Sequence, residues 1–291
     1  MVVATSRRAF LVGAAALIAA PHLARAAPAS RIVTLEWTAT EIALSLGLRP
    51  VGVAERDAYR SWVAVDNEGL KDAVDVGRRQ QPSLESIRRL SPDLILSSRF
   101  RHQSLQEKLG ELAPTELLDD QPEDGDMLAA VYASVRQAGK ALGREDAAAK
   151  LLSGFDARIA ALKAKVPAHK AGQRVVVAQP LPGTARLRVF SSNAAVAQLL
   201  ERIGFPAGLA LPPQPFGFTA IDLEGLAALD GETTLILLSD SVPQELAESA
   251  LWPMLPVVAA GEVITVGAAN WPFGSIAALS RLMETVAGKL A

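Results

Sequence analysis

The chain contains no cysteine, and only three of its 291 residues are histidines. Without cysteine there can be no disulfides, thiolate metal sites or cysteine nucleophiles. His102 and His169 lie far apart and match no zinc-protease pattern, so we expect two surface histidines. Neither a transition-metal site nor a protein-bound cofactor is expected.

Familiar enzyme motifs are also missing. The sequence has no G-x-S-x-G nucleophile elbow, no P-loop and no G-x-G-x-x-G dinucleotide fingerprint. We therefore do not expect an enzyme. Because a serine–histidine–carboxylate site needs no local motif, a hydrolase stays open as the less favoured alternative. The adjacent Asp119 and Asp120 are interpreted as a solvated turn.

Acidic residues outnumber basic ones after the first residues. The formal net charge is −2, and it becomes −5 if a leader carrying Arg7, Arg8 and Arg25 is removed. This balance argues against a nucleic-acid partner. Residues 1–26 have the pattern of a twin-arginine signal peptide, with a short apolar run and a small-x-small cleavage site. We expect export to the periplasm, with a retained membrane anchor as the alternative.

What the chain does contain is a regular alternation of strand and helix patterns. Residues 31–120 alternate short apolar runs with helical segments, which predicts an α/β fold with a mostly parallel sheet. Thr38 and Glu41 have the spacing of a capping box at the start of the first helix. Gly47 can end that helix in the left-handed conformation.

The middle of the chain carries helix patterns only. No strand signal occurs over 126–166, and the α/β alternation resumes afterwards. This organisation predicts two similar lobes with a ligand cleft between them, or alternatively two ordinary helices inside one domain. The expected parts are an N-terminal α/β lobe over 27–142, a bridging helix over 143–167 and a C-terminal α/β lobe over 168–291.

A weak internal repeat supports two lobes. The stretch PSLESIRRLSPDLILSS, residues 82–98, resembles IDLEGLAALDGETTLILLSD, residues 221–240. Both stretches read as a short helix followed by a buried strand. Each places a glutamate, Glu85 or Glu224, directly after a leucine in the first helical turn. Chance likeness of two αβ units is the alternative interpretation.

Aromatic residues form only 5% of the chain, so their positions are informative. Trp37, Trp62 and Trp271 avoid the strongest helical patterns, and Phe216 and Phe218 lie in a proline-rich loop. Residues that follow strands in α/β lobes point toward the cleft. Aromatic side chains there would suit a bulky amphipathic ligand, although each could equally pack in the core.

Two stretches carry a family resemblance. RIVTLEWTATEIALSLGLRPVGVAERDAYRSWV and DVGRRQQPSLESI resemble the periplasmic ferric-hydroxamate siderophore-binding proteins. The resemblance covers essentially the whole mature chain and recurs at NAAVAQLLERIG, LWPMLP and NWPFGS. It implies two lobes joined by a long helix, a ferric siderophore as ligand and an inner-membrane ABC permease as partner. In this family the siderophore alone holds the iron. We expect a monomer.

The resemblance also assigns ligand-binding residues. Arg79 matches the arginine that donates hydrogen bonds to iron-bound hydroxamate oxygens. The aromatic residues that cover the ligand correspond to Trp62, Phe216 and Trp271.

The chain departs from the family at one anchor position. The family has a tyrosine where this sequence has Phe100, and phenylalanine donates no hydrogen bond. Arg99, Arg101 and His102 beside it, or the hydroxyl of Tyr59, could compensate. The ligand could therefore be a ferrichrome-type hydroxamate, a carboxylate or mixed siderophore, cobalamin or haem.

The resemblance gives the repeated glutamates a role as well. In this group one glutamate on each lobe docks onto arginines of the two transmembrane subunits, and the matching residues are Glu85 and Glu224. The simpler interpretation is that each carboxylate stabilises its helix N-terminus.

Overall fold

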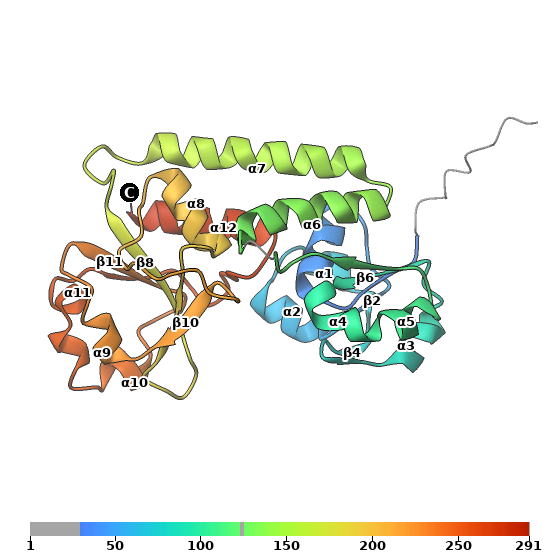
Figure 1. The fold of residues 1–291 in the computed structure, drawn as a ribbon, viewed down its shortest axis with the longest axis horizontal. Helices are drawn as coiled ribbons and strands as arrows, with labels where there is room; N and C mark the ends of the chain where they lie inside the picture. The colour runs from blue at the N-terminus through green and yellow to red at the C-terminus, as the bar shows by residue number, and fades with distance from the viewer. Residues whose placement is uncertain (1–29, 123–124, 291) are drawn as a thin grey trace, which may run out of the picture.

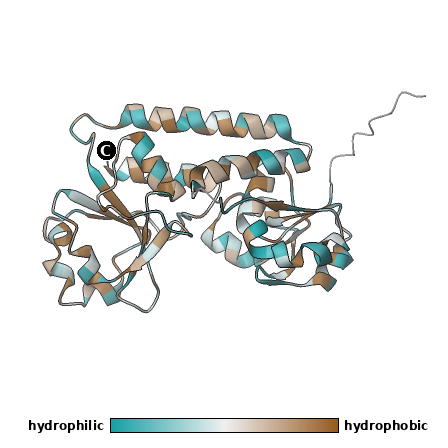
Figure 2. Cartoon of the chain, viewed as in Figure 1, coloured by the Kyte–Doolittle hydropathy of each residue, from teal (hydrophilic) through white to brown (hydrophobic). Residues whose placement is uncertain are grey.

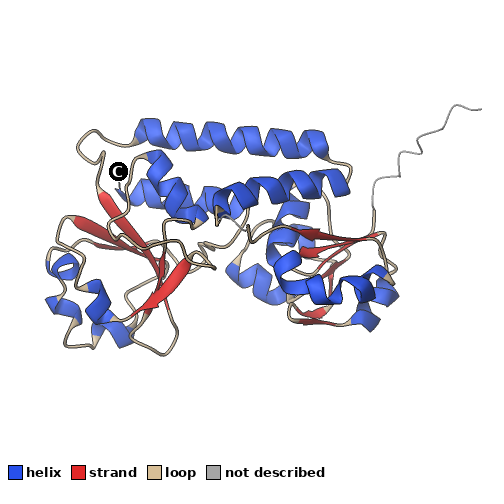
Figure 3. Ribbon diagram, viewed as in Figure 1, coloured by secondary structure: helices blue, strands red, loops and turns tan. Residues whose placement is uncertain are grey.

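A computed structural model of the chain describes residues 30–122 and 125–290, and the predicted leader lies outside this part. Two α/β lobes stand side by side, and long helices run along one edge of both (Figure 1). Each lobe combines a sheet with surrounding helices (Figure 3), which confirms the predicted fold class. No helix within the described ranges is long and apolar enough to cross a membrane.

The first lobe is built on a parallel sheet with the strand order β3-β2-β1-β6-β7. Its central strands, β1 and β6, are fully buried, so apolar residues occupy successive positions in both and do not alternate with charged ones. The strands of this lobe are β1 (Ile32–Thr34), β2 (Gly52–Val53), β3 (Val74–Asp75), β6 (Leu94–Ser98) and β7 (Thr115–Leu118), with a separate hairpin of β4 (Gly77–Arg78) and β5 (Gln81–Pro82). The helices are α1 (Trp37–Ser45), α2 (Arg56–Trp62), α3 (Leu84–Leu90), α4 (Arg99–His102) and α5 (Gln106–Gly110).

The second lobe has a mixed sheet with the order β10-β9-β8-β11-β12. Strands β8, β11 and β12 are parallel, whereas β9 is antiparallel to β8 and β10 is antiparallel to β9. Its strands are β8 (Arg174–Pro180), β9 (Leu187–Phe190), β10 (Phe218–Ile221), β11 (Thr233–Leu237) and β12 (Val263–Thr265). The helices are α8 (Ala195–Ile203), α9 (Leu223–Leu226), α10 (Gln244–Ala247), α11 (Pro256–Ala259) and α12 (Ile276–Leu290).

Two helices connect the lobes. These are α6 (Met127–Ala141) and α7 (Glu145–Lys165), and α7 extends over both lobes (Figure 1). Hydrophilic and hydrophobic residues alternate along α7 (Figure 2). The apolar side of α7 enters a single core cluster that includes Ile42 of the first lobe, Phe155 of α7 and Leu282 of α12. Because the lobes share this core through the helices, a wide hinge opening would expose buried apolar surface.

The first helix begins differently from the prediction. Glu36 is its N-cap, and the Glu36 carboxylate accepts a hydrogen bond from the backbone N–H of Trp37 at 3.0 Å. Thr38 therefore lies inside α1, and the predicted capping box was wrong. Glu41 is buried, and its carboxylate binds backbone N–H groups at the start of α12 instead. Gly47 follows the helix with a φ of +77°, as expected.

The two repeated stretches occupy equivalent places. Helices α3 and α9 are each capped by a side chain, from Ser83 and Asp222 respectively. Each helix leads into a strand, β6 or β11, that pairs in parallel with the first strand of its lobe, β1 or β8. The repeat is therefore a feature of the architecture.

Candidate ligand-binding cleft

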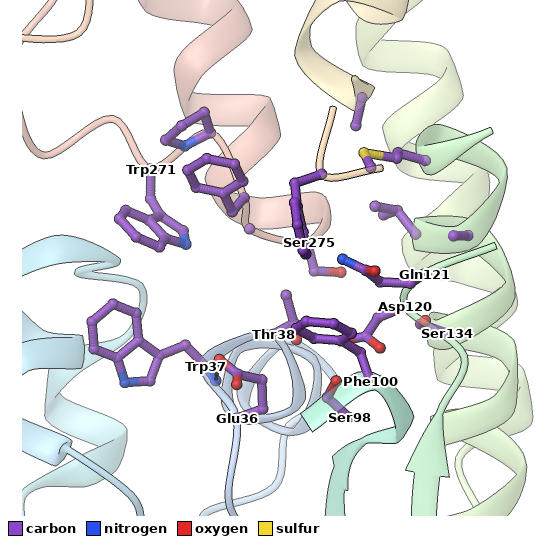
Figure 4. Close-up of a pocket in the computed structure, with 18 of the residues that line it drawn as sticks. Glu36, Trp37, Thr38, Ser98, Phe100, Asp120, Gln121, Ser134, Trp271 and Ser275 are labelled. Carbon is purple, nitrogen blue, oxygen red and sulfur yellow. Dashed lines mark hydrogen bonds between the residues drawn. The ribbon is translucent and has the colours of Figure 1, made fainter. Parts of the chain in front are cut away.

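A cavity of about 350 Å³ lies between the two lobes and is bounded by α6. Side chains that follow β1, β6 and β7 reach it from the first lobe, because the carboxyl ends of parallel strands meet at one edge of a sheet. Side chains of β9 and β10 and of the segment after β12 reach it from the second lobe. In Figure 4, Trp37 and Trp271 lie at one end, with Phe100 and Asp120 toward the other.

Arg79 enters the cavity from the tip of the β4–β5 hairpin. Its Nη1 donates a hydrogen bond to Oε1 of Glu36 at 2.7 Å, and its Nε donates to Oε2 of Glu55 at 2.9 Å. The guanidinium carbon lies 3.5 Å from the centroid of the Trp37 ring, within cation–π range. Two carboxylates and an indole thus fix the orientation of this arginine.

Glu36 links Arg79 to a second arginine. One carboxylate oxygen of Glu36 binds Arg79, and the other accepts a hydrogen bond from Nε of Arg101. The side chain of Glu36 is only 8% exposed, so its charge is balanced by arginines inside the protein. Together with Glu55, these residues form a network of two acids and two arginines whose formal charge is zero.

His102 contacts the backbone of Arg79 and helps to fix its position. It is fully buried, so the expectation of a surface histidine was wrong. Its Nε2 lies 2.7 Å from the carbonyl oxygen of Arg79, and its Nδ1 lies 2.6 Å from the hydroxyl of Ser97. Since a carbonyl can only accept, Nε2 carries the hydrogen and Nδ1 accepts from Ser97. Burial lowers the pKa of His102, which favours this neutral form.

The second lobe contributes Arg188 from β9. Its Nη1 donates to Oε1 of Gln179 at 2.6 Å. Its guanidinium lies over the rings of Phe218 and Phe273, at 4.4 and 5.4 Å from their centroids. No acidic side chain within the described ranges forms an ion pair with it. Burial lowers the pKa of Arg188, but a guanidinium remains charged in proteins.

Aromatic rings line the cleft and connect the lobes at two places. Phe100 of the first lobe packs edge-on against Phe216 of the second, with ring centroids 5.5 Å apart. Trp271 of the second lobe contacts Trp37 at 5.3 Å and Trp62 at 6.1 Å. The cleft therefore offers flat apolar surfaces beside its arginines, an arrangement suited to a ligand with both apolar and charged parts.

A partly buried carboxyl group completes the polar lining. Burial raises the pKa of Asp120, which lines the cavity, whereas the neighbouring Asp119 is exposed and paired with Arg99. The solvated-turn interpretation thus holds for Asp119 only. No group of three or more potential metal ligands occurs within the described ranges.

Comparisons with known proteins agree with this arrangement. The family described as periplasmic binding protein matches residues 32–269. This chain belongs to that family. It is 30% identical to the iron(3+)-hydroxamate-binding protein FhuD of Escherichia coli over 84% of this chain and 82% of that protein. It is 26% identical to the achromobactin-binding periplasmic protein of Dickeya dadantii over 88% of this chain and 85% of that protein.

A solved structure shows the same fold. The siderophore-binding protein FhuD of Vibrio cholerae, bound to Fe³⁺-Desferal, superposes with a TM-score of 0.81 at 28% sequence identity. The match covers 90% of this chain and 97% of the Vibrio cholerae protein. The two-lobed arrangement is therefore that of a known siderophore-binding protein.

The structure brings most of the predicted ligand-binding residues to one cavity, and those that line it are Arg79, Phe100, Arg101, Phe216 and Trp271. Trp62 lies outside the lining, although its ring contacts that of Trp271.

Two further predicted residues, Tyr59 and Arg99, also lie outside the cavity lining. Tyr59 is fully buried in another cluster, and its hydroxyl donates to the carbonyl of Val65 at 3.1 Å. Its hydroxyl is therefore not available to a ligand, contrary to our expectation. Arg99 is turned to Asp119 and the Leu117 carbonyl, away from the cavity lining.

Phe100 presents its ring to the cleft without a hydroxyl. The residue is 52% exposed, and its ring packs on that of Phe216. The neighbouring Arg101 does line the cavity, so it can supply donors near the position where the family has a tyrosine.

Sequence reasoning missed Glu36, Glu55 and Arg188 as site residues. Glu36 could have been found, because it lies two residues after the end of β1, at the carboxyl edge of the sheet. Arg188 could have been noticed as a charge within the apolar run of β9.

The repeated glutamates lie outside the cleft. Glu85 is 80% exposed at its side chain and pairs with Arg89 one turn further along α3. Glu224 is exposed in the first turn of α9. Helices α3 and α9 lie on different lobes, both on the side away from α7 (Figure 1).

Proposed function

We propose that this chain captures a ferric siderophore between its lobes and presents it to an ABC importer in the inner membrane. The observation that carries the proposal is the cavity at the strand ends of both lobes, where arginines and aromatic rings converge. A ferric chelate has this combination of an apolar skeleton and polar oxygens around the metal. The chelate brings its own iron ligands, so the protein acts as a receptor and not as an enzyme.

A hydroxamate-type ligand is the first candidate. By the sequence resemblance, Arg79 matches the arginine that binds hydroxamate oxygens in this family, and the relative from Escherichia coli is named for binding an iron(3+)-hydroxamate. Nε and Nη1 of Arg79 are held by Glu55 and Glu36, which leaves Nη2 without a partner within the described ranges. A ligand oxygen can therefore accept from Nη2 without breaking the existing ion pairs.

Glu85 and Glu224 are the proposed docking residues for the importer. Both are exposed, both stand in the first turn of equivalent helices, and both lie on the side of the molecule away from α7. One carboxylate on each lobe fits a transporter whose two membrane subunits are related by a two-fold axis.

The experiment that tests the proposed function is a titration of tryptophan fluorescence with a panel of ferric chelates. Trp37 and Trp271 line the cavity, so an occupied cleft should change their emission. The panel contains hydroxamate, carboxylate and catecholate chelates, with haem and cobalamin as competing ligands. A response to haem or cobalamin alone would overturn the siderophore assignment, as would no response to any compound. Recovery of the unaltered chelate after incubation is expected, and its conversion to smaller products would favour a hydrolase.

A further inference from the structure

Arg188 differs from the other arginines of the cleft in its charge balance. Arg79 and Arg101 are matched by Glu36 and Glu55, so the first lobe presents a network that is neutral before any ligand arrives. Arg188 has no acidic partner among the residues that the structure describes. The second lobe therefore brings an unbalanced positive charge to the cavity.

The surroundings of Arg188 make this charge effective. The guanidinium lies over Phe218 and Phe273, and Gln179 is the one side chain in the described ranges to which it donates a hydrogen bond. Its Nε is buried and has no hydrogen-bond partner in the described chain. A partly buried charge beside aromatic rings interacts more strongly with an opposite charge than the charge of a fully exposed arginine does. Contact with the two rings also restricts the movement of the guanidinium, which reduces the ordering needed on binding.

We propose that Arg188 is the anion-binding and specificity-determining residue of the cleft, and that the preferred ferric chelate carries a carboxylate that binds it. This inference rests on the proposed function and names the ligand class more closely. Three hydroxamates neutralise the charge of Fe³⁺ and leave nothing for Arg188 to balance. Replacing one hydroxamate by an α-hydroxycarboxylate, which binds iron as a dianion, leaves the chelate negative. The hydroxamate groups then face Arg79, and the carboxylate faces β9.

The test compares three ferric chelates on the full chain: ferrichrome as a neutral trihydroxamate, a citrate-based dihydroxamate, and an anionic tris-catecholate without a carboxylate. Each is titrated against wild type, Arg188→Gln, Arg188→Lys and Arg186→Gln. Arg186 precedes β9, is exposed and lies outside the cavity lining, so its replacement removes the same charge as a matched control.

We expect wild type to prefer the citrate-based chelate. Arg188→Gln should lower the affinity for that chelate about 10- to 100-fold, the range of a charge-assisted hydrogen bond. The affinity for ferrichrome should change less than about 3-fold. Arg188→Lys should retain part of the affinity, and Arg186→Gln nearly all of it. Equal losses for ferrichrome and the citrate-based chelate would show a general packing role and overturn the inference. A loss for the tris-catecholate as large as for the citrate-based chelate would show that charge alone is sensed and overturn the carboxylate assignment.

Stability of the ligand-free protein gives a second readout. Because Arg188 carries a partly buried charge without a counter-ion in the described chain, Arg188→Gln should leave the thermal midpoint unchanged or raise it. A clear fall in the midpoint would indicate a structural role. If wild type binds none of the chelates, the proposed function fails together with this inference. If wild type binds them and Arg188→Gln binds equally well, only this inference fails.

Discussion

Glu41 provides the sharpest test of how the lobes are held together. Its carboxylate comes from α1 of the first lobe and is fully buried. One oxygen accepts from the backbone N–H of Ser275 at 2.7 Å, and the other accepts from that of Ala278 at 2.9 Å. These donors belong to the start of α12, where a helix has unpaired N–H groups and a partial positive charge. A side chain of one lobe thus caps a helix of the other.

The perturbation we choose is Glu41→Gln, which keeps the volume but replaces one oxygen by an NH₂ group. The amide can accept only one of the two bonds, so one buried backbone N–H loses its acceptor. That loss costs about 1–3 kcal/mol of unfolding free energy at pH 7. Gly274 lies so close that a Cβ there would come within 2.8 Å of a Glu41 oxygen, so little space exists for repacking or for water.

The stability difference between wild type and Glu41→Gln should depend on pH in a defined direction. Burial raises the pKa of Glu41, and the backbone bonds and Arg281 only partly oppose this. As the pH rises above the unfolded pKa, the unfolded chain releases this proton before the folded chain does, so wild type loses stability that Glu41→Gln cannot lose. The gap in unfolding free energy between the two proteins should therefore be wider at pH 5 than at pH 7.

Urea unfolding followed by tryptophan fluorescence measures this gap. Glu284→Gln is the matched control, because Glu284 lies on α12 in an exposed ion pair with Arg158. This substitution should change the free energy of unfolding by less than about 0.5 kcal/mol. If Glu41→Gln is as stable as wild type at both pH values, the bonds to α12 contribute nothing net and the reasoning is refuted. Trp271 is close in sequence to these donors, so a loosened α12 should also weaken ligand binding.

Three further predictions concern the cleft and the outer surface. Arg79→Ala should weaken ferric-hydroxamate binding by about 1.5–3 kcal/mol in a fluorescence titration. Arg78 lies on the same hairpin but is exposed and outside the cavity lining, so Arg78→Ala should not weaken binding. Equal effects of the two substitutions would remove Arg79 from the site. Folding lowers the pKa of His102, so the unfolded wild-type chain takes up the proton first and wild type loses unfolding free energy as the pH falls below about 6.5. His102→Gln should remove this loss, so its unfolding free energy should depend less on pH. Parallel urea-unfolding profiles of both proteins from pH 7 to 5 would contradict this. Glu85→Ala combined with Glu224→Ala should spare chelate affinity and lower uptake of radioactive iron by cells; normal uptake would exclude the docking role.

The overall fold could be predicted because its signals are local. The buried strands β1, β6 and β11 each contain a short apolar run beside small hydroxyl residues, and the segment of α6 and α7 has helical patterns without any strand signal. The β4–β5 hairpin was missed because each strand has only two residues, which is too short for a periodic pattern. The antiparallel β9 and β10 were not distinguished from parallel strands, since pairing direction depends on distant partners.

The site was predictable only in part, for a similar reason. Arg79 was found through a family resemblance, but its partners Glu36 and Glu55 lie 43 and 24 residues away in sequence. Spacing in one sequence does not show that three such charges meet. Tyr59 was misplaced because α2 turns its ring into the core, which the short pattern around Trp62 did not indicate.

The two lobes contribute different kinds of charged groups to the cleft. The first lobe holds its arginines in ion pairs that exist without a ligand, so its surface is preformed and formally neutral. The second lobe supplies the unbalanced charge of Arg188. Trp37 and Trp271, like Phe100 and Phe216, already touch across the cleft, and the shared core through α7 limits how far the lobes can part. Discrimination between chelates must therefore come mainly from fit and charge in a preformed cleft, because a large closing motion would have to break contacts that the ligand-free protein already makes.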